Sequence, residues 1–236
     1  MTVAPIPVFV GPSLPPEDRR GTGFEWRSPA SAGDILALVE RAPARLCLID
    51  GFFDSRPAPW HKELLQVMAQ GTLIFGAASM GALRAAELHR FGMIGVGVIF
   101  RAYRNGLLVG DDEVALIHTD ERLRWAPLTI PMVEVRATLI AACRARIVTP
   151  AMARRIRSLV HQIHFQDRDW PMIEGACLAE GLVHEATFRR LQQLHVELKR
   201  GDARACLAAA LTMDVPVRRP TAPPDTCFIR ALAAQL

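Results

Sequence analysis

The stretch at residues 72–88, TLIFGAASMGALRAAEL, restricts the fold of this chain more than any other segment. Its first four residues are typical of a buried strand, and the apolar periodicity after Ser79 is typical of a helix. Only a glycine and two alanines separate the two, so the strand must turn directly into the helix. Such a junction is the building unit of α/β folds with parallel sheets.

Further strands and helices are expected on both sides of this junction. Apolar runs predict strands at residues 5–10, 46–50 and 94–100, and helical periodicity predicts helices at 32–41, 59–70 and 80–91. The Asn105-Gly106 turn, which is typical of hairpins, predicts an antiparallel edge. We therefore expect an α/β fold with a mostly parallel sheet and βαβ crossovers, followed by an α-helical C-terminal extension.

The pattern changes beyond Pro127, where strands give way to helices only. The expected helices are at 131–146, 150–163, 170–180, 185–199 and 202–212. We divide the chain into an α/β core at 1–130, a helical extension packed on it at 131–213, and a proline-rich tail with a short terminal helix at 214–236.

Composition excludes several classes of protein. Of the 236 residues, 50% are hydrophobic and 22% are charged, as in soluble globular proteins. The sequence holds neither a signal peptide nor an apolar run of the ~18 to 20 residues that span a membrane. Five cysteines without C-x-x-C spacing indicate reduced thiols and a cytoplasmic protein.

Basic residues are almost all arginine, and only Lys62 and Lys199 are lysine. The arginines cluster at 154–157 and 189–190 without the interleaved aromatic residues that stack on nucleic acid bases. A solvated helix face or an acidic protein partner explains these clusters, and we expect no nucleic acid or membrane partner.

No metal or cofactor is expected. The acidic triplet Asp111-Asp112-Glu113 suits the start of a solvated helix, and the histidines at 161 and 164 lack a third ligand. The glycines of residues 92–97, GMIGVG, overlap a predicted strand, and no predicted helix follows them as a dinucleotide-binding motif requires.

Ser79 is the candidate nucleophile. It lies in Ala77-Ala78-Ser79-Met80-Gly81, a G-x-S-x-G elbow in which alanine replaces the first glycine. The amides of Met80 and Gly81 would then face a developing oxyanion at the start of the helix, behind Gly76. The alternative is a serine that only caps the helix.

Lys62 is the candidate base. Helices that follow parallel strands begin at the carboxyl edge of the sheet, so we expect Lys62 level with Ser79, and Asp50 and Ser13 at the same edge. A lysine can activate a serine without a third residue. The alternative is a surface lysine. His61 and His118 are candidates for a Ser-His-Asp triad, but the sequence places no acidic partner beside either.

Several segments together resemble one known family. They are PVFVGPSLP, LIDGFFD, WHKELL, FGAASMGALRAAEL and GMIGVGVIFRAY, and they resemble the TfuA-like proteins, which are partners of YcaO enzymes in peptide backbone thioamidation. The resemblance covers residues 8–103 and continues more loosely to 141.

The resemblance implies a Ser-Lys hydrolase site at Ser79 and Lys62. The resemblance further implies that such a site hydrolyses the C-terminal thiocarboxylate of a ThiS-like sulfur carrier and releases sulfide for YcaO. It also implies that the protein binds YcaO and can improve the hold of YcaO on the precursor peptide. Gly11, Gly51 and Gly76 would keep the edge low enough for a thin carrier tail. The alternative function is a non-catalytic adaptor that binds YcaO and presents the peptide or the carrier.

Overall fold

The computed structural model describes residues 4–234. It divides into two compact units: the chain up to Leu108 together with the chain from Lys199 onward, and Val109–Leu198. The first boundary lies at 108, where 130 was predicted. The second lies at 198 and not at the predicted 213, because the last long helix packs on the sheet. Residues 1–3 of the predicted core and 235–236 of the predicted tail lie outside the described residues.

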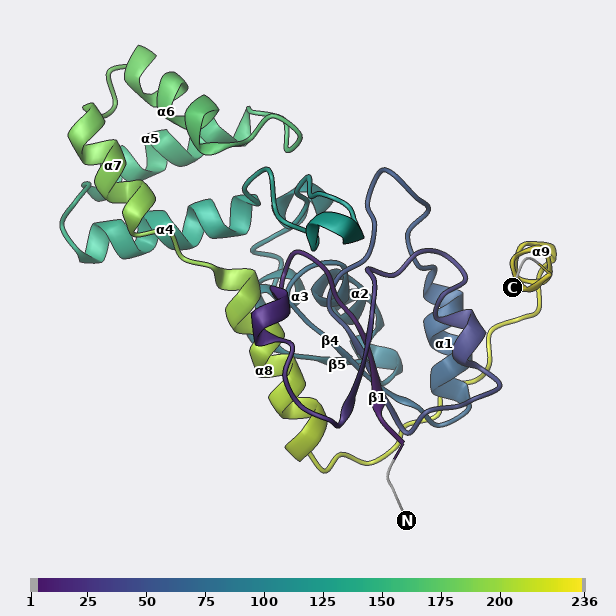
Figure 1. Cartoon of the computed structure of the whole chain (residues 1–236). Helices are drawn as coiled ribbons and strands as arrows, with labels where there is room; N and C mark the ends of the chain where they lie inside the picture. Colours follow the sequence, from purple (N-terminus) through teal and green to yellow (C-terminus); the bar gives the residue numbers. More distant parts are fainter. Residues whose placement is uncertain (1–3, 235–236) are drawn as a thin grey trace. The chain divides into compact units, whose positions relative to one another are not determined.

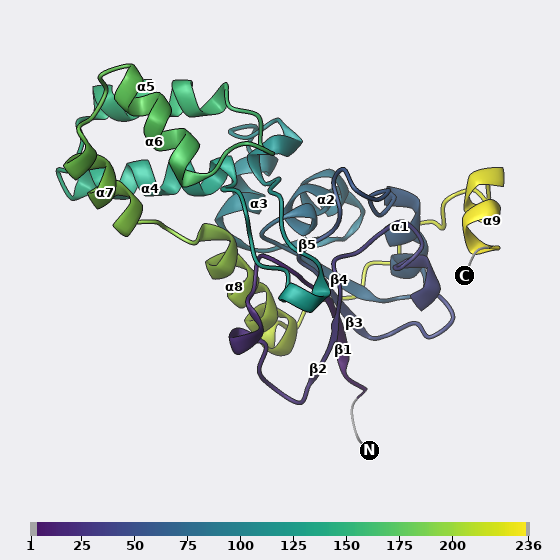
Figure 2. The ribbon, with the colours of Figure 1, turned by 45° about the horizontal axis from the view of Figure 1, so that its top comes forward.

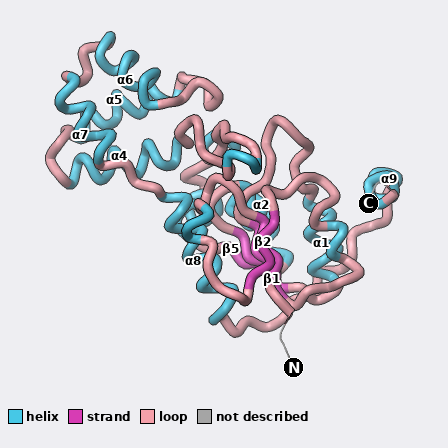
Figure 3. Tube along the Cα trace, viewed as in Figure 1, coloured by secondary structure: helices cyan, strands magenta, loops and turns pink. Residues whose placement is uncertain are grey.

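The first unit is built on a parallel sheet of five strands in the order β2-β1-β3-β4-β5. The strands are β1 Ile6–Phe9, β2 Phe24–Arg27, β3 Arg45–Leu48, β4 Leu73–Gly76 and β5 Ile94–Gly95, and strands are drawn in magenta in Figure 3. The predicted α/β class is confirmed. The predicted antiparallel edge is wrong, because every strand pair is parallel and Asn105 follows a helix.

Helices cover both faces of this sheet (Figures 1 and 2). On one face, small residues of α8 (Leu198–Thr212) let the helix approach the strands closely. Ala203, Cys206 and Ala210 pack there with Cys47 and Phe75. On the other face lie α1 (His61–Ala69) and α2 (Met80–Leu88), and α2 contacts β3, β4 and β5.

The predicted helix at 32–41 is wrong. The segment folds as turns with one short 3-10 helix, η2, at Leu36–Leu38. Gly33 has a φ of 98°, a left-handed value that an α-helix cannot contain. The Glu63 side chain accepts hydrogen bonds from the amides of Gly33 and Leu36, which stabilises this irregular path.

The predicted strand at 94–100 is shorter than expected. It stops after Gly95, and α3 begins at Gly97 and ends at Arg104. The carboxylate of Asp202 accepts hydrogen bonds of 2.8 Å from the amides of Val98 and Ile99. A helix therefore does follow the glycines of residues 92–97, but a side-chain carboxylate already occupies the position at its start where a phosphate would bind.

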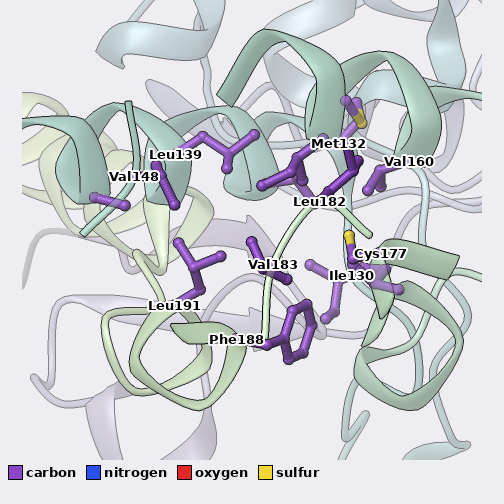
Figure 4. Packing of buried hydrophobic residues seen from close by; sticks show 14 residues of the cluster. Ile130, Met132, Leu139, Val148, Val160, Cys177, Leu182, Val183, Phe188 and Leu191 are labelled. Carbon is purple, nitrogen blue, oxygen red and sulfur yellow. The ribbon is translucent and has the colours of Figure 1, made fainter. Parts of the chain in front are cut away.

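The second unit is helical, as predicted. Its helices are η4 Asp111–Glu113, η5 Glu121–Leu123, α4 Met132–Arg144, α5 Pro150–His161, α6 Trp170–Ala179 and α7 Glu185–Gln193. Side chains from α4 to α7 form a common core, in which Leu139, Val183 and Phe188 are buried (Figure 4). Asp112 and Glu113 bind arginines, Arg168 and Arg136 respectively.

The remaining helices belong to the first unit. They are η1 Pro16–Asp18, η3 His89–Phe91 and the terminal helix α9 at Cys227–Ala233. None of the helices formed by residues 4–234 is both long enough and apolar enough to span a membrane. Within the same residues, no group of three His, Cys, Asp or Glu side chains could hold a metal ion, and the cysteines are free thiols.

We expect Gly81→Ala to destabilise the protein strongly. A Cβ at Gly81 would lie 1.8 Å from the carbonyl oxygen of Leu48, so helix and strand would have to separate. The expected loss is at least about 2 kcal/mol of unfolding free energy, measured by urea denaturation. Gly175→Ala is the control, because a Cβ there meets nothing within 4 Å and alanine favours a helix. Equal stability of the Gly81 variant and the wild type would contradict this packing.

Candidate functional site

The chain turns sharply between β4 and α2. Ala78 has a φ of 65°, and the amide of Ser79 donates a hydrogen bond of 2.8 Å to the carbonyl of Ala77. These values indicate a γ-turn with a left-handed central residue, a rare and strained conformation for a side chain other than glycine. Ser79 itself has an irregular backbone, with φ −118° and ψ −124°. Strain of this kind is found at functional sites more often than elsewhere.

The end of β3 holds this turn in place. The amide of Ala77 donates to the carbonyl of Leu48, and the amide of Gly81 donates to that of Ile49, both at 3.2 Å. A Cβ on Gly76 would lie 2.3 Å from the carbonyl oxygen of Gly81, so the two glycines permit the close approach of α2. The strained turn is therefore held by hydrogen bonds to β3 at its start and to the residue after β3 at its end.

The side chain of Ser79 is not used to cap α2. Ser79 precedes the helix but makes no side-chain hydrogen bond to it, and the residue is 2% exposed. The amides of Ala78 and Met80 also have no hydrogen-bond partner among residues 4–234. The turn thus leaves one hydroxyl and two flanking amides for a bound group.

The expected oxyanion role of Gly81 needs correction. Because its amide donates to Ile49, that amide is not available to a ligand in this structure. Gly81 and Gly76 instead allow α2 and the strands to pack in direct contact. Gly51 leaves room for the Met80 side chain, because a Cβ at Gly51 would lie 2.9 Å from Met80 Cγ. The Met80 amide can still donate to an oxyanion as expected, and the Ala78 amide is a second candidate donor.

The carboxylate of Asp50 binds the loop after β1. It accepts hydrogen bonds from the amides of Gly11 (2.8 Å) and Ser13 (3.0 Å) and from the Ser13 hydroxyl (2.6 Å). This contact lies between β1 and β3, where the strand order reverses and open α/β sheets form their binding crevices. Sequence reasoning placed Ser13 and Asp50 at one edge, and the structure joins them directly. Buried and bonded in this way, Asp50 shapes the edge and does not act as a free base.

Lys62 lies in the first turn of α1 and is partly buried. Its Nζ atom is 3.5 Å from the hydroxyl of Thr226, in the C-terminal segment. That segment also passes Gly71 and Gly92, beside which Arg219 and Arg218 lie, and it buries Ile229. The tail is therefore in contact with a predicted site residue.

No hydrogen bond among the described residues joins Lys62 to Ser79. The start of α1 is instead bound to the far part of α2, where His61 Nε2 lies 2.7 Å from Glu87 Oε2. Glu87 is eight residues beyond Ser79, about 12 Å along a helix axis. This contact places His61 beside a late turn of α2, and the alignment of Lys62 with Ser79 stays a prediction.

The two histidines differ in their surroundings. His61 has an acidic partner, Glu87, which the sequence did not place and which also binds Arg84 at 2.8 Å. His118 belongs to the helical unit, and its Nδ1 atom lies 2.7 Å from the carbonyl of Thr119.

Glu63 is a positioning residue that sequence reasoning missed. Its fully buried carboxylate accepts from the amides of Trp60 (2.8 Å), Gly33 (2.8 Å) and Leu36 (3.2 Å), so it fixes the start of α1 and the adjacent Lys62. Burial raises the pKa of Glu63. The sequence signal for this role was a Glu at the third position of the helix, as in a capping box. It was missed because the residue before the helix is Trp60, where a capping box has Ser or Thr.

Comparison with known proteins gives one match. The profile of a protein family described as "TfuA-like protein" matches residues 50–169, just over half of the chain, and this range includes Ser79 and Lys62. A search of curated proteins found no match.

We expect Asp50→Asn to disturb the loop at Ser13. The Asn side chain would turn an NH2 group toward donors that now face a carboxylate oxygen, which costs about 1 to 3 kcal/mol of unfolding free energy. Urea denaturation measures this loss. Asp214→Asn is the matched control, because Asp214 is exposed. If both variants were equally stable, the Asp50 carboxylate would not be what holds the loop at Ser13 in place.

Proposed function

This chain belongs to the TfuA-like protein family, and from that membership and the geometry of the Ser79 turn we propose that it is an accessory hydrolase of ribosomal peptide thioamidation. The proposed substrate is the C-terminal thiocarboxylate of a ThiS-like sulfur-carrier protein. Its hydrolysis would supply sulfide to a YcaO enzyme, which would place the sulfur in a peptide backbone.

The strained turn before Ser79 is the observation that supports this proposal most. A serine needed only as a helix cap would use its hydroxyl for the cap, and a structural turn would place glycine, not alanine, at a φ of 65°. The turn instead leaves the hydroxyl unused between two unpaired amides. Those amides suit the oxygen of a tetrahedral intermediate.

The proposed reaction has two steps. In the first, Ser79 Oγ attacks the carbonyl carbon of the thiocarboxylate, its proton passes to Lys62, and the carbon–sulfur bond breaks. The proton returns to the leaving sulfur, and the carrier stays bound to Ser79 as an ester. In the second step water cleaves the ester, which releases the carrier carboxylate and frees the serine. Thiolate is a good leaving group, so a third catalytic residue is not required.

Lys62 must move for this chemistry. Its amine would leave the hydroxyl of Thr226 and form a hydrogen bond with that of Ser79 instead. The amine would also have to be neutral in order to accept a proton. A carrier tail bound between the two residues would displace water, which favours the neutral amine. A tail rich in glycine also suits a residue as deeply buried as Ser79.

The alternative is a non-catalytic adaptor that binds YcaO and presents the peptide or the carrier. Two observations favour it: the amide of Gly81 is already bonded, and Lys62 contacts Thr226 instead of Ser79. An adaptor would need neither the Ser79 hydroxyl nor an amine at Lys62. Substitution of these two residues therefore distinguishes a hydrolase from an adaptor.

We expect Ser79→Ala and Lys62→Arg each to lower sulfide release from a thiocarboxylated ThiS-like carrier by at least about a hundredfold, because one removes the nucleophile and the other keeps the charge but cannot act as a base. Sulfide is measured by a fluorescent trap under single-turnover conditions. Ser158→Ala, an exposed serine of α5, is the control and should behave as the wild type.

Two outcomes would contradict the hydrolase. The first is release at the wild-type rate by either site variant. The second is a wild type that releases no sulfide from the carrier, although it and both variants support thioamidation when YcaO receives free sulfide. The second outcome would establish the adaptor.

A further inference from the structure

The surface of α4 and α5 in the helical unit carries an unusual concentration of positive charge. Residues 132–161 contain six arginines and a single carboxylate, Glu134, which binds His195. Arg136 is neutralised by Glu113, to which it is bound through both guanidinium nitrogens that face it. Arg144, Arg154 and Arg157 are exposed, and no carboxylate of residues 4–234 forms an ion pair with any of them.

These arginines surround an apolar groove. The groove has a volume of about 420 Å³, and Leu139, Ile140, Cys143, Pro150 and Ala153 line it together with Arg136, Arg144, Arg154 and Arg157. Ile140 is 55% exposed, whereas Leu139 beneath it belongs to the buried core. The groove thus combines an apolar lining with exposed arginines that have no ion-pair partner, a combination that suits a bound partner.

Charge and shape together point to the chemistry of the occupant. Arg154 and Arg157 are three residues apart on α5 and so project from one face, with Arg144 on the α4 side of the groove. Guanidinium groups bind carboxylates in a bidentate manner, and the apolar floor accepts an aliphatic side chain. A single-stranded nucleic acid typically stacks its bases on aromatic side chains, and none lines the groove, whereas the apolar lining offers nothing to a phosphate backbone.

We propose that this groove binds an acidic segment of a partner protein. An aliphatic side chain of the segment would enter between Leu139, Ile140 and Ala153, and carboxylates on either side of it would contact Arg144, Arg154 and Arg157. The inference goes beyond the proposed hydrolase: it concerns a surface made entirely of residues of the helical unit, and it would hold equally for an adaptor.

The test is fluorescence anisotropy on the full chain with a labelled synthetic peptide of 14 residues, in which leucines at helical spacing are separated by glutamates. The wild type should bind it. We expect Arg154→Glu combined with Arg157→Glu to weaken binding at least about tenfold, because two attractions become repulsions. Ile140→Ser should weaken binding a few-fold, because it removes apolar contact from an exposed position without opening the core.

The matched control is Arg189→Glu combined with Arg190→Glu, which makes the same change of charge at exposed positions of α7. It should bind the peptide within about twofold of the wild type, because neither arginine lines the groove and salt at about 0.1 M screens exposed charges that make no direct contact with the peptide. A peptide in which lysine replaces every glutamate should not bind.

Any of three results would overturn the proposal. The first is a wild type that fails to bind the acidic peptide. The second is an α7 control that loses as much affinity as the groove variant, which would indicate unspecific attraction. The third is a wild type that binds an oligonucleotide or an anionic vesicle more tightly than the peptide, together with a groove variant that has lost this affinity.

Discussion

The contact between the first turn of α2 and the end of β3 is the constraint on which the candidate site depends. Gly81 packs against the Leu48 carbonyl with no room for a side chain, and its amide is bonded to Ile49. With the helix fixed so close to the strand, the residues between β4 and α2 have too little length for an ordinary turn. The positive φ of Ala78 follows from that restriction.

Hydrogen bonds from backbone amides to buried carboxylates hold other parts of the first unit in place. Asp50, Glu63 and Asp202 each accept hydrogen bonds from at least two backbone amides of another segment. Burial raises the pKa of Glu63 and of Asp202, and the amides offset that cost by favouring the charged form. Each carboxylate thereby fixes a loop or a helix start that the backbone alone would leave without partners.

Sequence patterns predicted the elements whose signal is local. The buried strands β1, β3 and β4 and the helices α4 to α8 follow from apolar periodicity, and the strand order then explains why Ser13 meets Asp50. The strand β2 was missed because its side chains are all only partly buried, so FEWR shows no clear alternation. The helix α3 was missed because GVIFRAYR has the composition of a strand, and its start is stabilised by Asp202, which is more than a hundred residues away. The position of Lys62 depends on the pairing of His61 with Glu87 and on Thr226 in the tail, contacts that no local pattern encodes.

A covalent intermediate on Ser79 is the central claim, and it is most directly tested by trapping. The wild type would be mixed with a thiocarboxylated ThiS-like carrier, quenched in acid within one turnover, digested and analysed by tandem mass spectrometry. We expect the C-terminal residue of the carrier as an ester on the peptide that contains Ser79, and we expect this ester to decay as the carrier with a C-terminal carboxylate accumulates. Sulfide release at the full rate with the ester on another residue, or with no ester at all, would contradict it.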